Sequence, residues 1–235
     1  MQAFAALLDS LIYTRGRNAK LKLIVDYLHA TPDPDRGWAM AALTGDLDLP
    51  GVKPAQIRAL IEARVDPVLF RMSRDYVGDT AETVALLWPA PVVPPPDAGP
   101  LSITAAVDAL RHLSRSDAPA VLAGMLDRLD AEERFALLKM ATGGLRIGVS
   151  ARLAKTALAQ AFGLDVDAVE EVWHGLSPPY ASLFAWAEGK GAQPTPADVP
   201  VFRPFMLAHG LEDAQVDLAD YAAEWKWDGI RVQIV

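Results

Sequence analysis

The feature that most constrains the fold is the spacing of apolar residues, which return every three or four positions through most of the first 190 residues. The segment FAALLDSLIYTRGRNAKLKLIVDYL, residues 4–28, shows this spacing on both sides of a polar, basic turn. Such spacing places apolar side chains on one face of an α-helix, so it predicts two helices joined around residues 14–18. Hydrophobic residues make up 51% of the 235 residues, which is enough for a sizeable core.

The same spacing predicts further helices on both sides of a proline-rich segment. WAMAALTG is closed by Gly45, KPAQIRALIEAR has Pro54 in its first turn, and Asp79 or Thr80 can cap a helix before residues 81–88. PAPVVPPPDAGP, residues 89–100, cannot be helix or central strand because proline lacks the amide donor. Four more helices are predicted in ITAAVDALRHLS, APAVLAGMLDRL, DAEERFALLKMA and ARLAKTALAQAF. Residues 1–192 are therefore expected to form an all-α domain.

Composition changes after residue 192. QPTPADVPVFRPFMLAHG carries four prolines, and YAAEWKWDGIRVQIV then alternates polar residues with aromatic or β-branched ones. This alternation is typical of a strand. The prediction is a mainly α protein, in which residues 193–235 form a linker and the first β-strands of a second domain.

The net charge of -8 argues against nucleic acid as a partner, because phosphate binding depends on Lys and Arg. Charge distribution matters more than the sum, and two segments contain basic residues but no acidic ones. They are residues 11–25 and residues 134–164. These two segments are candidates for an anion-binding surface in an otherwise acidic chain.

A glycine-rich loop in the second basic segment leads into a predicted helix start. Glycine lets a backbone approach a phosphate closely, and the amide groups at a helix start can bind an anion. The predicted contacts are Gly144, Arg146, Gly148, Ser150, Arg152 and Lys155, with Thr14, Arg17, Asn18 and Lys20 of the first segment as a second set. An ordinary solvated basic face and a capped helix start are the alternative interpretation.

The chain closes with EWKWDGIRVQIV, in which charged residues alternate with tryptophans. In a strand, Glu224, Lys226 and Asp228 share one face while Trp225 lies on the other. One interpretation is an edge strand whose charged face is solvated. Gly229 and Arg231 favour another, because glycine permits close backbone approach and arginine offers a donor fork to a phosphate or ribose.

KWDGIR resembles the lysine-any-aspartate-glycine motif of nucleotidyltransferases, a group that includes ATP-dependent DNA ligases, RNA ligases and capping enzymes. RPFMLA, residues 203–208, resembles the segment that opens the adenylation domain of DNA ligases. Three helical segments resemble the N-terminal DNA-binding domain of larger ATP-dependent ligases: RNAKLKLIVDYL, YVGDTAETVALL and TGGLRIGVSARLAKTALAQAF. Small ligases and capping enzymes lack that helical domain, so a DNA ligase is favoured.

This resemblance implies a role for each residue of the terminal motif. Lys226 would be the nucleophile that forms lysyl-AMP, Glu224 would contact adenine, and Arg231 would contact the ribose or a phosphate. Asp228 and Gly229 would shape the loop that binds the cofactor. The implied cofactors are ATP and Mg²⁺, and no side-chain metal site is predicted from the scattered histidines.

The resemblance also implies how the protein acts. The expected partner is nicked double-stranded DNA, bound without sequence preference by a cytoplasmic monomer with no membrane segment. Later ligase motifs would lie beyond Val235, so residues 1–235 are expected to be an N-terminal portion that binds DNA but does not ligate alone. Two alternatives remain, namely a non-catalytic helical DNA-binding or scaffold protein and an RNA ligase of the same superfamily.

Overall fold

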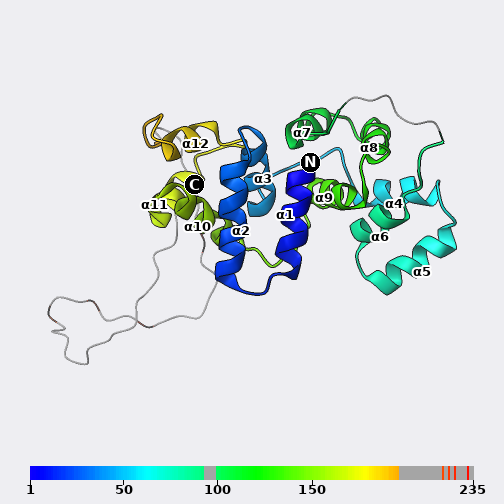
Figure 1. The fold of residues 1–235 in the computed structure, drawn as a ribbon, viewed down its shortest axis with the longest axis horizontal. Helices are drawn as coiled ribbons and strands as arrows, with labels where there is room; N and C mark the ends of the chain where they lie inside the picture. Colours follow the sequence, from blue (N-terminus) through cyan, green and yellow to red (C-terminus); the bar gives the residue numbers. More distant parts are fainter. Residues whose placement is uncertain (93–98, 196–218, 220–221, 223–224, 226–231, 233–235) are drawn as a thin grey trace.

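The described part of the protein is built from α-helices. A computed structural model describes residues 1–92 and 99–195, together with Ala219, Ala222, Trp225 and Val232 (Figure 1). Within these residues there are twelve helices. They are α1 (Gln2–Tyr13), α2 (Arg17–Ala30), α3 (Asp35–Thr44), α4 (Pro54–Glu62), α5 (Pro67–Val77), α6 (Thr80–Leu87), α7 (Ile103–Arg111), α8 (Ala118–Leu126), α9 (Ala131–Thr142), α10 (Ala151–Phe162), α11 (Val166–Trp173) and α12 (Ala181–Ala187).

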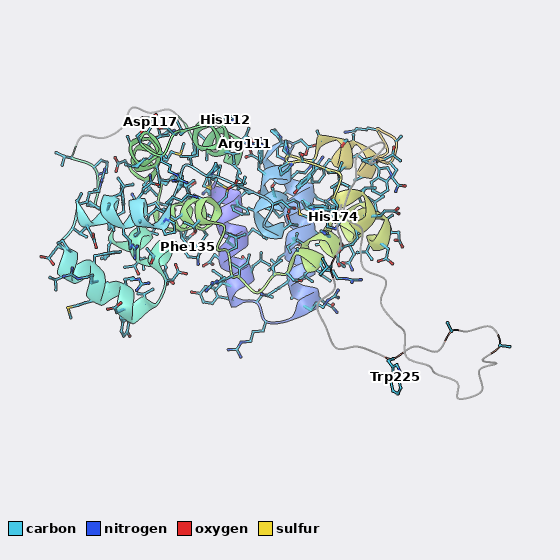
Figure 2. The ribbon with its side chains drawn as sticks, turned by 180° about the vertical axis from the view of Figure 1, so that it is seen from behind. Arg111, His112, Asp117, Phe135, His174 and Trp225 are labelled. Carbon is cyan, nitrogen blue, oxygen red and sulfur yellow. The ribbon has the colours of Figure 1, made fainter. Side chains whose placement is uncertain are left out.

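Two pairs of helices that are far apart in the sequence, α1 with α2 and α9 with α10, form the centre of the helical region. Helix α1 packs against α2 and α9, and α2 packs against α10. On α1, the apolar positions Phe4, Leu8 and Leu11 have no exposed surface, as expected of residues that recur on one helical face. Side chains fill the space between the helices (Figure 2). This packing brings the first 30 residues beside residues 131–162.

The remaining helices extend this centre in two directions. Helices α4, α5 and α6 gather at one end of the molecule, where α6 packs against α9, while α11 and α12 lie at the other end (Figure 1). Helix α3 contacts both α10 and α7, so it links the four central helices to α7 and, through α7, to α8. Each of these helices contributes buried apolar side chains to one continuous core.

The predicted helix starts and stops are confirmed where the sequence supplies a capping residue. Helix α3 ends at Gly45, which has a left-handed φ of 86°. Pro54 opens α4, and the Asp79 carboxylate caps α6 by accepting from the Glu82 amide at 3.1 Å. The segments predicted as helices after residue 100 form α7, α8, α9 and α10. Helices α11 and α12 were anticipated only as parts of a helical region.

The prediction of β-strands near the end of the chain was wrong for the residues that the structure describes. None of residues 193–195, Ala219, Ala222, Trp225 and Val232 lies in a strand. A strand requires backbone hydrogen bonds to a neighbouring strand and burial of at least one face. The described residues provide no neighbouring strand, and Trp225, expected on the core face, is 86% exposed. The described fold is therefore all-α, and the domain boundary at residue 192 stays a prediction.

None of the described helices combines the length and the hydropathy that a bilayer-crossing segment needs.

The Asp46 carboxylate attaches the last helices to the end of α3. Its Oδ2 atom accepts hydrogen bonds from Trp173 Nε1 at 2.8 Å, from the Tyr180 hydroxyl at 2.7 Å and from the Thr44 hydroxyl at 2.7 Å. Partial burial acts to raise the pKa of Asp46, but the three hydrogen bonds and the positive charge of Lys155 together outweigh it and the pKa is lowered. The ionised carboxylate therefore stabilises the attachment of α11 and α12.

We expect Asp46→Asn to lower the free energy of unfolding by about 1–2 kcal/mol at pH 7, because the amide presents hydrogens to groups that are themselves donors. A carboxylate whose pKa is lowered on folding contributes stability above its unfolded pKa of about 3.9, and this contribution is lost as the pH falls through the folded pKa. The difference between the two proteins should shrink below about pH 4. Urea denaturation across pH 3–7 measures it, and a constant difference would contradict this account.

Candidate nucleic-acid interface

The two basic segments meet at one open groove. The groove has a volume of about 990 Å³ and is formed by the end of α1, the turn into α2, the loop between α9 and α10, and the first turns of α10. We call it the basic groove. Its lining includes Arg15, Arg17, Lys20, Arg146 and Arg152, and no carboxylate. Side chains that are more than 120 residues apart in the sequence therefore contribute positive charge to one concave surface.

Lys20 ties the two sides of the basic groove together. It lies in the first turn of α2 and is only 7% exposed. Its ammonium group donates to the backbone carbonyls of Ile147, at 2.8 Å, and Gly148, at 3.0 Å. Because these carbonyls belong to the loop before α10, the hydrogen bonds fix the position of that loop relative to α2.

The loop before α10 has an unusual backbone that exposes one arginine. Arg146 has a positive φ of 44° and Gly148 a φ of 68°. A non-glycine residue in this region is strained and persists only where its surroundings hold it. Leu145 and Ile147, on either side of Arg146, are buried at 9% and 4% exposure and anchor the loop to the core. The Arg146 side chain is left on the exposed surface of the groove.

The arginines of the basic groove are available to an anion. Arg15, Arg17 and Arg146 are exposed and form no ion pair with any residue that the structure describes. Arg152 lies 4.0 Å from the Asp167 carboxylate, but both side chains are mostly exposed. An exposed pair at this distance contributes little, so Arg152 can exchange it for a phosphate.

Other residues predicted to contact DNA have internal partners. Lys155 is buried, pairs with the Glu170 carboxylate at 2.9 Å and lies over the Trp173 ring. Ser150 lines the groove, but its hydroxyl caps α10 by accepting from the Leu153 amide. The Gly144 carbonyl accepts from Lys139. Neither Gly144 nor Lys155 lines the groove, and the same holds for Asn18, which is exposed on α2.

Arg15 was not among the residues predicted to contact DNA, although it lines the basic groove and is exposed. Its signal in the sequence was its position in the acid-free segment of residues 11–25. Thr14 and Thr156 also line the groove, and their hydroxyls donate to the backbone carbonyls of Ser10 in α1 and Arg152 in α10.

The predicted nucleotide site lies outside the described residues, which include none of Glu224, Lys226, Asp228, Gly229 and Arg231. In the described ranges, no group of three or more His, Asp or Glu side chains is placed to hold a metal ion. The candidate site among the described residues is therefore the basic groove.

Gly148 offers a test of how closely the two sides of the groove are packed. A Cβ atom at Gly148 would lie 2.6 Å from Lys20 Nζ, and its φ of 68° disfavours other residues. Gly163 has a similar φ of 66° but nothing within 4 Å of its Cβ position. We expect Gly148→Ala to lower the unfolding free energy by about 1–2 kcal/mol more than Gly163→Ala, because only the former forces the Lys20 ammonium away from the two carbonyls that it binds.

Urea denaturation of both alanine variants beside the unaltered chain measures this difference. Equal losses at the two glycines would show that the Lys20 ammonium is free to move away from the loop.

Comparison with known proteins identifies relatives that share this region. The chain matches the family model for the DNA ligase N terminus over residues 1–175. It is 30% identical over 240 residues to a probable DNA ligase of Anaeromyxobacter sp. (strain Fw109-5), an alignment that covers 96% of this chain and 41% of that protein. It is 28% identical over 233 residues to a probable DNA ligase of Saccharopolyspora erythraea, covering 94% of this chain and 40% of that protein.

A DNA ligase of Methanothrix thermoacetophila is 35% identical over 107 residues, covering 42% of this chain and 18% of that protein. The chain thus spans about two fifths of the length of the first two relatives. The family model covers well over half of the chain and includes both sides of the basic groove. This chain belongs to the DNA ligase N-terminus family.

Proposed function

We propose that this chain is the DNA-binding portion of an ATP-dependent DNA ligase, and that the basic groove holds the phosphate backbone of nicked duplex DNA. The observation that carries the proposal is the convergence of the two acid-free segments on one groove lined by four arginines and Lys20. The acidic residues responsible for the net charge of -8 lie outside this lining. A polyanion is therefore attracted to the groove and repelled by other parts of the surface.

The chemistry of the groove suits a backbone better than a base sequence. Guanidinium groups bind phosphate oxygens through two parallel N–H donors, and the groove lining has no Asn or Gln side chain to read adenine and no carboxylate to read cytosine. Contacts to phosphates fix position and orientation but carry no sequence information. A protein that closes nicks wherever they occur needs binding of this kind, and a monomer suffices for it.

The ligation step is proposed from the resemblance of residues 224–231. Lys226 would attack the α-phosphorus of ATP through its neutral amine, with release of pyrophosphate and formation of a bond between the lysine nitrogen and AMP. Glu224 would bind adenine and Arg231 the ribose or a phosphate. Mg²⁺ would neutralise phosphate charge during the transfer.

We expect the double change Arg146→Ala and Arg152→Ala to weaken binding to a nicked duplex by roughly 10-fold to 100-fold at low salt, because two charge-assisted contacts to phosphates are lost. The slope of log affinity against log salt should fall by about two, since each lost phosphate contact removes about 0.9. Fluorescence anisotropy with a labelled nicked duplex, from 50 to 300 mM salt, gives both quantities.

The matched control is Arg58→Ala with Arg71→Ala, which removes two exposed arginines on α4 and α5, outside the basic groove. This control changes the net charge by the same amount but leaves the basic groove unaltered. The affinity of the control variant for the nicked duplex should therefore stay within about two-fold of that of the unaltered chain. Equal weakening by the two double changes would mean that overall charge, rather than the groove, determines binding.

We expect the protein encoded by the complete gene to become labelled by ATP carrying a radioactive α-phosphate in the presence of Mg²⁺, and Lys226→Ala to abolish the label. The reason is that only an amine at this position supplies the attacking nitrogen. Lys190→Ala, which removes an exposed lysine outside the motif, should keep the label. Labelling that survives in Lys226→Ala would place the nucleophile elsewhere.

A further inference from the structure

We propose that Lys20 is a positioning residue of the DNA interface, which holds the loop before α10 in the conformation that presents Arg146 to the phosphate backbone. The inference rests on the proposed function of the basic groove and assigns a different role to this lysine from that of the groove arginines. It follows from the partners of the Lys20 ammonium, from its burial and from the backbone of the loop.

The partners of Lys20 distinguish it from the other buried cations. Four Lys or Arg residues are buried in the described part of the chain, and Arg36, Lys139 and Lys155 each pair with a carboxylate. The Lys20 ammonium instead donates to two backbone carbonyls and pairs with no carboxylate among the described residues. A buried charge is costly unless its donors are satisfied, so these two hydrogen bonds are needed in the folded state.

The two carbonyls belong to the part of the loop that is strained. Arg146, with its positive φ, directly precedes Ile147, whose carbonyl accepts from Lys20. The next carbonyl, that of Gly148, also accepts from it, and the absence of a side chain at Gly148 leaves room for the ammonium. Removing the ammonium frees both carbonyls, so the backbone at Arg146 can relax to a negative φ and turn its side chain away from the groove.

Burial separates Lys20 from the arginines that can reach DNA. With 7% of its surface exposed and two of its three N–H donors bound to the loop, Lys20 has little left to offer a phosphate. Arg15, Arg17 and Arg146 are exposed at the same groove. In this arrangement Arg146 makes the contact, and Lys20 determines where Arg146 lies.

A double-mutant cycle tests the inference. The affinity for a nicked duplex is measured for the unaltered chain, Lys20→Met, Arg146→Ala and the double variant, at several salt concentrations. If Lys20 acts through Arg146, Lys20→Met should weaken binding by about as much as Arg146→Ala, roughly ten-fold, and the double variant should be no more than about two-fold weaker than either. If Lys20 contacts phosphate independently, the two losses multiply and the salt slope of the double variant falls by a further 0.9 or so, which would overturn the proposal.

Hydrogen exchange supplies a readout other than affinity. In Lys20→Met, the amides of residues 145–149 should exchange faster while those of α10 beyond its first turn keep their protection. Unchanged exchange of the loop would also overturn the inference. If circular dichroism shows Lys20→Met to be unfolded, Lys20→Gln serves the same cycle, because its side chain keeps an apolar stem but is one bond too short to reach the two carbonyls as the ammonium does.

Arg36→Met is the matched control for lost stability. Arg36 is an equally buried cation, but its partners Asp33 and Glu188 lie at the α3 and α12 end, away from the groove. This variant should melt at a lower temperature and keep the affinity for DNA within about two-fold. An unaltered chain that does not bind nicked DNA would refute the proposed function, whereas multiplicative losses in the cycle would refute only the role of Lys20.

Discussion

The structure depends on the burial of the apolar faces of α1 and α2 against α9 and α10. These helices are far apart in the sequence, and their side chains form the centre of one continuous core. Burial of apolar surface is the main favourable term in folding, and here it also determines which polar residues become neighbours. The basic groove is a product of this packing, because neither the turn before α2 nor the loop before α10 forms a groove alone.

Buried cations reinforce the contacts that apolar packing creates. Lys139 binds the Asp79 carboxylate and the Gly144 carbonyl, so it joins the cap of α6 to the loop after α9. Arg36 binds Asp33 and Glu188 and lies over the Phe184 ring at 4.4 Å, which joins α3 to α12. Such pairs contribute less net stability than their attraction suggests, because desolvation opposes it, but breaking one leaves an unpaired buried charge. They therefore favour one arrangement of the helices over others.

The sequence was sufficient for much of the local structure. Helix ends followed from capping residues such as Gly45 and Asp79, whose conformation or hydrogen bonds depend on neighbours in the chain. A strand depends on hydrogen bonds to a neighbouring strand that can be distant in the sequence. Alternation of polar and apolar residues alone therefore wrongly predicted that Trp225 lies in a strand.

The candidate site was predicted only in part, because it too depends on contacts between residues that are far apart in the sequence. The sequence identified both basic segments. It did not indicate that the two segments meet in space, nor which of their Lys and Arg side chains are buried and bound to partners within the protein. Lys155 and Arg152 lie three positions apart on α10, yet the first is buried against Glu170 and the second is exposed. The position of α11 determines which of the two side chains is buried. That position depends on the packing of the whole fold and not on the local sequence.

The burial of lysines in this fold has a consequence for the chemistry of its amines. Of the lysines that the structure describes, Lys20, Lys139 and Lys155 are buried, whereas Lys22, Lys53 and Lys190 are exposed. Acylating reagents attack only a neutral amine that they can reach, so the folded chain protects half of these side chains from modification. Acylation of Lys20 would require the loop before α10 to detach from α2. The rate at which Lys20 is acylated therefore reports how often the two sides of the groove separate.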